Sequence, residues 1–354
     1  MRPDEAQPWS PLAHPGKLSI MADSVNDNPQ DPAQQSLADI LANLPAVRAG
    51  RKANALSRIN RRLIEPIETG QDNDDPRLAF QHTVFCQTSL PYRDPGDDVR
   101  LWRRTQGTTL LEVQAGRVLN PAIMDTVEVG LPWGTKPRLI LAHLNAEALR
   151  QGSPVIEVES SLSAFVKRIR GFNGGREIRA FKDQLTRLSA ALIRMAVARG
   201  ETRGYQLESK VITAFDLWLQ KNEQQRVLWP STIQLSLDYF ASLQEHAVPL
   251  NEADLAALAH SAMALDLYAW LAQRLHRIDP TRPVFLQWPA IMQQFGPGYA
   301  HMGHFKSKFR TALKQVLARY QAARIDEDER GLRLHNSPPP VTKRLVALPP
   351  QSRA

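Results

Sequence analysis

Two groups of basic residues at helical spacing are the side chains of this sequence that could do chemistry. Arginine and lysine bind phosphate oxygens, and arginine also pairs with guanine edges in a major groove that admits one helix. The spacing therefore predicts nucleic-acid contacts from two helices. The residues are Arg176, Arg179, Lys182 and Arg187 in the first helix, and Lys306, Lys308, Arg310 and Lys314 in the second.

The first helix is predicted over residues 176–192. At about 100° per residue its arginines lie opposite an apolar stripe, with Lys182 at the flank. Asp183 shares the basic face and would repel phosphate, so a groove contact and a merely solvated face both stay open. The residues expected to face the core are Ile178, Phe181, Leu185 and Leu188.

The second helix is predicted over residues 304–320, and no acid interrupts the bases between Lys306 and Lys314. Its outward face is expected to carry polar and basic residues, with Lys306 and Lys308 on the two borders. The outward residues are Ser307, Arg310, Thr311 and Lys314, and the inward ones are Phe305, Phe309, Leu313, Val316 and Tyr320.

Each basic helix follows another helix after a short turn, which is typical of a helix-turn-helix. In residues 76–220 a helix begins at Ser161, and two strands follow the basic helix around the turn RGETRG. These strands would form a wing whose Arg199 and Arg203 contact phosphates. The strands are predicted over residues 193–198 and 205–215.

The same plan recurs in residues 221–335, where the strand PVFLQW and a helix from Pro289 to about Phe295 precede the second basic helix. A hairpin over residues 322–334 follows and carries the acidic turn DEDERG. DNA should repel this turn unless the turn points away or contacts a protein. The predicted fold class is α+β, with two tandem winged-helix domains. Two more helices are expected over residues 252–258 and 261–275.

Three further elements are predicted ahead of the first helix-turn-helix. Residues 108–114 and 126–131 alternate in polarity and are expected to be strands of one hairpin or adjacent antiparallel pair. Pro137 opens an apolar-striped helix that ends at Gly152.

The two ends of the chain are predicted to be largely disordered. Residues 1–75 hold a short amphipathic helix, marked by the stripe Leu37 to Leu44, and then a basic arm over residues 48–62. The stripe could dock a host helicase or its loader, or pack on the protein itself, and the arm could grip phosphates or be solvated. The tail, residues 336–354, is rich in proline and expected to be flexible.

Composition narrows the class of protein. Lysine and arginine total 44 against 36 acids, a net charge of +8, so a polyanion is the default partner. No apolar run is long enough for a membrane helix, and Cys86 is the only cysteine, which excludes disulfides within the chain and multi-cysteine metal sites. We therefore expect a cytoplasmic protein that needs no membrane.

No catalytic residue, cofactor or metal ligand is assigned. GxxxxGK[ST], GxGxxG and GxSxG motifs do not occur. His301 and His304 stand at helical spacing, but without cysteine or clustered carboxylates a capping or DNA-facing role is favoured over a metal site. The segment QLSLDY, residues 234–239, resembles peptides that bind the sliding clamp, although Leu235, Leu237 and Phe240 are expected to serve the core.

Several long blocks resemble the plasmid-encoded RepA family of replication initiators. The likeness runs over about residues 78–334. The matching blocks include HTVFCQTSLPYRDPGDDVRLWRRTQGTTLLEVQAG, VEVGLPWGTKPRLILAHLNAEAL, SLSAFVKRI, HAVPLNEADLAALAHSAMALDLYAWLAQRLHRI and HFKSKFRTALKQVL.

The resemblance implies a non-catalytic protein that binds repeated double-stranded sites at a plasmid origin and controls copy number. It implies recruitment of host replication proteins and dimers in some of its roles. A winged-helix transcriptional regulator, a DNA-nicking initiator enzyme and an adaptor for acidic proteins stay open as other readings.

Overall fold

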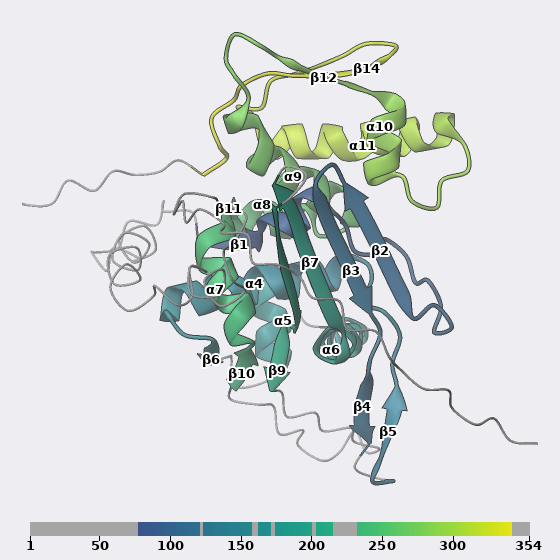
Figure 1. Ribbon diagram of the computed structural model, residues 1–354, viewed down its shortest axis with the longest axis vertical. Helices are drawn as coiled ribbons and strands as arrows, with labels where there is room; N and C mark the ends of the chain where they lie inside the picture. The colour runs from purple at the N-terminus through teal and green to yellow at the C-terminus, as the bar shows by residue number, and fades with distance from the viewer. Residues whose placement is uncertain are drawn as a thin grey trace, which may run out of the picture. The chain divides into compact units, whose positions relative to one another are not determined.

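The computed structural model describes residues 77–120, 123–157, 162–170, 174–199, 203–214 and 232–341 (Figure 1). The predicted amphipathic helix and basic arm lie outside the described residues, as does the tail beyond residue 341. The predicted domain boundary at residues 220 and 221 also falls outside them, so the two domain limits stay predictions.

The described residues form the mixed α+β fold that the sequence predicts. Up to residue 214 the elements are β1 Leu78–His82, α3 Thr83–Gln87, β2 Leu101–Gln106, β3 Thr109–Gln114, β4 Arg117–Asn120, β5 Asp125–Glu128, α4 Thr135–Gln151, β6 Val155–Glu157, α5 Leu162–Arg170, α6 Gly175–Ala190, β7 Leu192–Arg199, β8 Arg203–Lys210 and β9 Ile212–Ala214. They continue with β10 Thr232–Leu235, α7 Leu237–His246, β11 Ala247–Asn251, α8 Glu252–Leu258, α9 Ala262–Arg274, β12 Val284–Gln287, α10 Trp288–Phe295, α11 Met302–Arg319, β13 Ile325–Glu327 and β14 Gly331–Leu334.

One order of elements occurs twice. In the first run, α4 is followed by β6, α5 and α6, and in the second run, α9 is followed by β12, α10 and α11. Each run has a three-stranded sheet with the same order. In the first run β10 lies between β6 and β9, and in the second run β14 lies between β12 and β13. Figure 1 shows the second run as one group of elements.

The hairpin predicted after the first basic helix forms, but it is not a separate two-stranded wing. Strands β7 and β8 do form a hairpin, but β7 also pairs with β3, so the hairpin belongs to the sheet β2-β3-β7-β8. The strand predicted over residues 205–215 is interrupted at Val211, and β9 pairs with β10. Alternating polarity predicts that a segment is a strand but not which strand it pairs with, because every half-buried strand has the same two-residue period.

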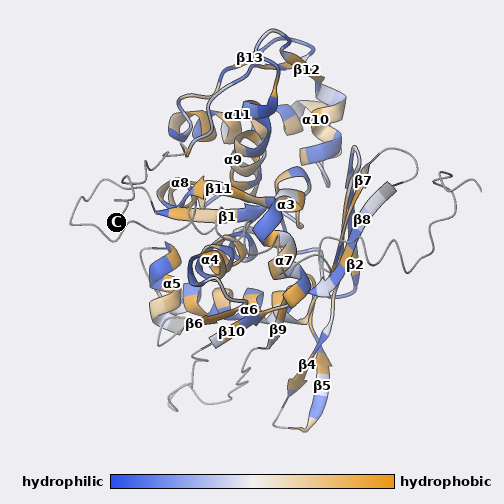
Figure 2. Ribbon diagram, turned by 60° about the vertical axis from the view of Figure 1, so that its left-hand side comes forward, coloured by the Kyte–Doolittle hydropathy of each residue, from blue (hydrophilic) through white to orange (hydrophobic). Residues whose placement is uncertain are grey.

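One predicted strand pairing is wrong. Strand β3 and strand β5 are not neighbours, since β3 lies between β2 and β7 while β5 pairs with β4. Together β4 and β5 form a separate ribbon that extends beyond the other sheets (Figures 1 and 2).

The outward row of the four-stranded sheet is a ladder of alternating charge. Arg103, Glu112, Arg194 and Glu208 face one another across β2, β3, β7 and β8 in register. The Arg103 Nε to Glu112 Oε2 distance is 3.3 Å, Arg194 Nη2 lies 2.7 Å from Glu208 Oε2, and Arg194 also bonds to Glu112. Because the opposite charges pair, this row does not form a cationic surface.

Helix α9 lies in the centre of the core. All of its residues except Arg274 are buried, as expected of a helix that is apolar on every side. Its Trp270 packs edge-on against Phe295 of α10, with ring centroids 5.2 Å apart. Strands β1 and β11 pair antiparallel beside it, which brings residues 78–82 against residues 247–251.

A buried histidine joins three of these elements. His82 is 1% exposed, its Nδ1 accepts a hydrogen bond from the Val84 N–H that begins α3, and its Nε2 lies 3.0 Å from Ser242 Oγ of α7. Burial, with a smaller contribution from nearby His246, lowers the pKa of His82 to about 3.

This histidine predicts a loss of stability in mild acid. The unfolded chain takes up a proton near pH 6.5 and the folded chain only near pH 3, so the contribution of His82 is full above pH 6.5 and declines as pH falls. We expect it to lower the free energy of unfolding by about 2 kcal/mol between pH 7 and pH 5. Urea denaturation at both pH values measures this. His82→Asn keeps a capping acceptor and should lose the dependence; an equal dependence in that variant would contradict the assignment.

Candidate nucleic-acid interface

Helix α11 separates an apolar face from a polar one, as predicted. Phe305, Phe309 and Val316 are fully buried, and Leu313 and Tyr320 are nearly so. The rings of Phe305 and Phe309 lie 5.5 Å apart and anchor the helix on α10 and α9. Figure 2 shows hydrophilic and hydrophobic residues alternating along α11. The exposed residues in the first four turns include His304, Ser307, Lys308, Arg310, Thr311 and Lys314.

Two of the predicted cations are held against an indole ring. Trp288, the first residue of α10, is 2% exposed. Lys306 Nζ lies 4.9 Å from the ring centroid of Trp288 and Arg310 Cζ lies 5.4 Å from it, which are cation–π distances. Lys308 and Lys314, in contrast, are exposed and have no ion-pair partner in the part of the chain that the structure describes.

The acidic turn after α11 contacts that helix. Arg310 Nε donates to Glu327 Oε1 at 2.6 Å, and Lys306 Nζ donates to the Glu329 carbonyl oxygen at 3.5 Å. The sequence left two alternatives for this turn, pointing away from DNA or contacting a protein. The structure shows a contact with the same chain. No sequence pattern points to this pair, because seventeen residues separate its members.

Helix α6 also has the predicted faces. Phe181, Leu185 and Leu188 are fully buried, and Arg176 and Arg179 are exposed. Lys182 is half-buried. The helix packs on α4, α5 and β9, so its apolar stripe serves the core of the first run.

The structure places Arg187 against the protein's own acids. Its side chain is 14% exposed, its Nε lies 3.1 Å from Asp183 Oδ2 and its Nη1 lies 3.4 Å from Asp97 Oδ1. Asp183 therefore has a partner on its own helix, one turn away. Asp97 comes from the loop before β2, a contact that helical spacing could not reveal.

Arg199 and Arg203 lie on β7 and β8, which belong to the four-stranded sheet and do not form a separate wing beside α6. Their backbones pair with each other beside the turn that connects β7 to β8, and their side chains lie outside the described residues. The predicted cations are thus gathered on α6 and on α11 rather than in one cluster.

The segment QLSLDY has a mixed placement. Leu235 and Tyr239 are fully buried, and the Tyr239 hydroxyl donates to Asn145 Oδ1 at 3.0 Å. Leu237, in contrast, is 69% exposed, so the expectation that it serves the core is wrong. Leu237 is the first residue of α7 and follows Ser236, whose side chain caps the helix.

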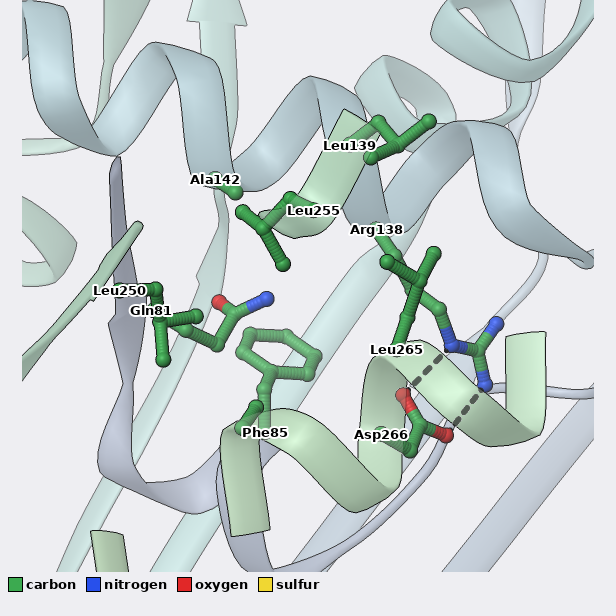
Figure 3. A pocket seen from close by; sticks show the side chains of 10 residues that line it. Gln81, Phe85, Arg138, Leu139, Ala142, Leu250, Leu255, Leu265 and Asp266 are labelled. Atoms are coloured by element: carbon green, nitrogen blue, oxygen red, sulfur yellow. Dashed lines mark hydrogen bonds and ion pairs between the residues drawn. The ribbon is translucent and has the colours of Figure 1, made fainter. Parts of the chain in front are cut away.

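A buried ion pair that the sequence analysis did not anticipate joins the two runs. Arg138 of α4 and Asp266 of α9 form two hydrogen bonds, Nε to Oδ1 at 2.7 Å and Nη2 to Oδ2 at 2.8 Å (Figure 3). Arg138 also donates to the carbonyl oxygens of Gly134 at 2.6 Å and Leu90 at 2.8 Å. Burial alone would lower the pKa of Arg138, but the charge and hydrogen bonds of Asp266 raise it above its ordinary value.

The cavity beside this pair does not form a ligand pocket. Gln81, Phe85, Leu139 and Leu255 line it together with the ion pair (Figure 3), and its volume of about 20 Å³ is room for a single water. Among the described residues no three His, Cys, Asp or Glu side chains are grouped as metal ligands would be. His304 packs against the Tyr299 ring, with centroids 5.4 Å apart.

None of the helices in the described ranges has both the length and the apolar character needed to cross a membrane.

Exposed cations on the outer faces of two helices are a feature shared with the nucleic-acid-binding class of proteins. Residues 131–288 match the family model described as "Plasmid encoded RepA protein". The resemblance to that family is thereby confirmed for these residues, which run from the loop before α4 to the start of α10.

Two solved structures are similar to this chain at low identity. One, "Crystal structure of SeMet derivatives of domain2 and domain 3 of RctB", is 8% identical with a TM-score of 0.45 and covers 72% of this chain and 96% of its own. The other, "Crystal structure of the RctB domains 2-3, RctB-155-483", is 9% identical with a TM-score of 0.39 and covers 78% and 94%. No curated protein matches the chain.

Proposed function

We propose that this protein is a plasmid replication initiator that binds repeated double-stranded sites at its origin. The observation that carries the proposal is the outward face of α11, where Lys308 and Lys314 stand exposed over a buried aromatic face. A helix of this kind can enter a major groove with its cations toward the phosphates. The family match over residues 131–288 supports a plasmid origin as the DNA that is bound.

We further infer that each run of elements is a winged helix. Helices α5 and α6, and likewise α10 and α11, would be the two helices of a helix-turn-helix, with the second of each pair in the groove. The strand orders β6-β10-β9 and β12-β14-β13 support this, because the last two strands of each run pair with each other. Strands β13 and β14 follow α11 in the sequence, and β9 packs on α6. In the first run, β7–β8 is an insertion before the last two strands.

The protein in this proposal has no catalytic step of its own. It would mark the origin and recruit host replication proteins, a helicase or its loader, which supply strand separation. The sliding clamp is the less favoured partner, because the QLSLDY segment has Leu235 and Tyr239 buried and cannot present all of its apolar side chains together.

A footprint over the plasmid origin tests the proposal. Lys314→Ala and Arg176→Ala should each weaken protection by about 1–3 kcal/mol, since each removes one contact to DNA, while leaving the melting temperature nearly unchanged. Lys210→Ala is the matched control, because this exposed lysine lies on β8 and not on either basic helix.

Two outcomes would count against the proposal. If Lys314→Ala and Lys210→Ala protect the origin equally well, α11 does not face DNA. If the wild type protects its sites but cannot maintain a reporter plasmid that carries the origin, the protein is a regulator rather than an initiator.

A further inference from the structure

The four acids of the turn after α11 differ in the contacts that their carboxylates make. Asp326 pairs with His335 at 2.7 Å, and Asp328 Oδ1 accepts from the backbone N–H groups of Arg330 and Gly331 at 2.8 and 2.9 Å, which shapes the turn. The Glu329 carboxylate has no partner within the described ranges. Glu327 alone of the four carboxylates reaches α11, through Arg310.

Arg310 is held on two sides and still half-exposed. Its Nε donates to Glu327 at 2.6 Å, its guanidinium lies over the Trp288 ring at 5.4 Å, and 51% of its side chain remains accessible. The Nη1 and Nη2 groups have no hydrogen-bond partner among the described residues. A guanidinium fixed by one edge keeps its other edge in a defined plane for a second acceptor.

That free edge fits one base in particular. Two parallel N–H donors match the O6 and N7 acceptors of guanine in a major groove, and fixing the side chain beforehand reduces the conformational freedom lost on binding. Lys308 and Lys314 lack such restraints and are mobile point charges, which suits phosphate contacts. Restraint therefore separates the cations of α11 into two kinds.

We propose that Arg310 reads a guanine edge and that Glu327 is its positioning residue. The inference rests on the proposed function, in which α11 lies in the major groove. Glu327 would act in two ways: it directs the Nη edge toward the bases, and it keeps Arg310 from taking a phosphate instead. The acidic turn would then contribute to sequence specificity, although its charge opposes DNA binding in general.

Binding to the footprinted site, to variants with each G·C pair replaced, and to competitor DNA tests this assignment. Arg310→Ala should abolish discrimination at one G·C position, where the wild type discriminates by about 5- to 150-fold. Glu327→Gln should reduce discrimination at the same position by about fivefold or more, and binding to competitor DNA should become tighter.

Glu329→Gln is the matched control, because it removes the same charge from the same turn without touching Arg310. It should tighten binding to every sequence alike and leave discrimination unchanged. The proposal is overturned if Glu327→Gln behaves like Glu329→Gln, or if Arg310→Ala weakens all sequences equally. Circular dichroism of each variant shows whether the protein still folds. Wild-type protein that protects no origin DNA would instead overturn the proposed function.

Discussion

Asp266→Ala should lower the free energy of unfolding by about 3–5 kcal/mol, the cost of leaving one member of a buried ion pair without its partner. Arg138 is 6% exposed and would lose both hydrogen bonds to the carboxylate. Its remaining acceptors are carbonyl oxygens, which offset the buried charge only in part. The pair joins α4 to α9, so the loss should be felt in both runs of elements.

Urea denaturation measures this effect, and two further variants define its cause. Glu252→Gln breaks the partly exposed pair with Arg168, whose atoms lie 2.7 Å apart, and should cost no more than about 1 kcal/mol. Replacing both buried residues, Arg138→Met with Asp266→Leu, should be nearly neutral, because no unpaired charge remains. A double variant as unstable as Asp266→Ala would show that packing at the site, and not charge, is responsible.

Raising the salt concentration from 50 to 200 mM should weaken origin binding about a thousandfold or more, if about six to ten phosphates are neutralised. The exposed cations of α6 and α11 would make some of these phosphate contacts, and the chain's net charge of +8 is consistent with further contacts from other basic residues. Each phosphate contact releases counterions from the duplex, which is why affinity depends on salt.

The slope of log K against log salt measures the number of contacts, and Lys314→Ala should reduce it by about one. Lys210→Ala should leave the slope as it is. An affinity that hardly changes with salt would contradict binding through phosphates and would favour protein partners for the basic faces.

The sequence alone determined the local elements and their inward faces. The stripes of α6 and α11, with Phe181, Leu185, Phe305 and Phe309 buried, follow from helical period, because a helix must turn its apolar side to the core whatever that core is. The order of the elements and the family resemblance, which is confirmed over residues 131–288, could also be predicted, because both follow from residues that lie close together in the sequence.

Only the tertiary structure decided which distant residues meet. It placed β7 and β8 in the sheet of β3, set Asp97 against Arg187, buried Arg138 on Asp266 and brought Glu327 to Arg310. Strand pairing and ion pairs between elements depend on how whole surfaces pack together. The charge or periodicity of one segment therefore does not predict which distant segment will contact it. Which cations stay free for DNA is therefore a property of the fold.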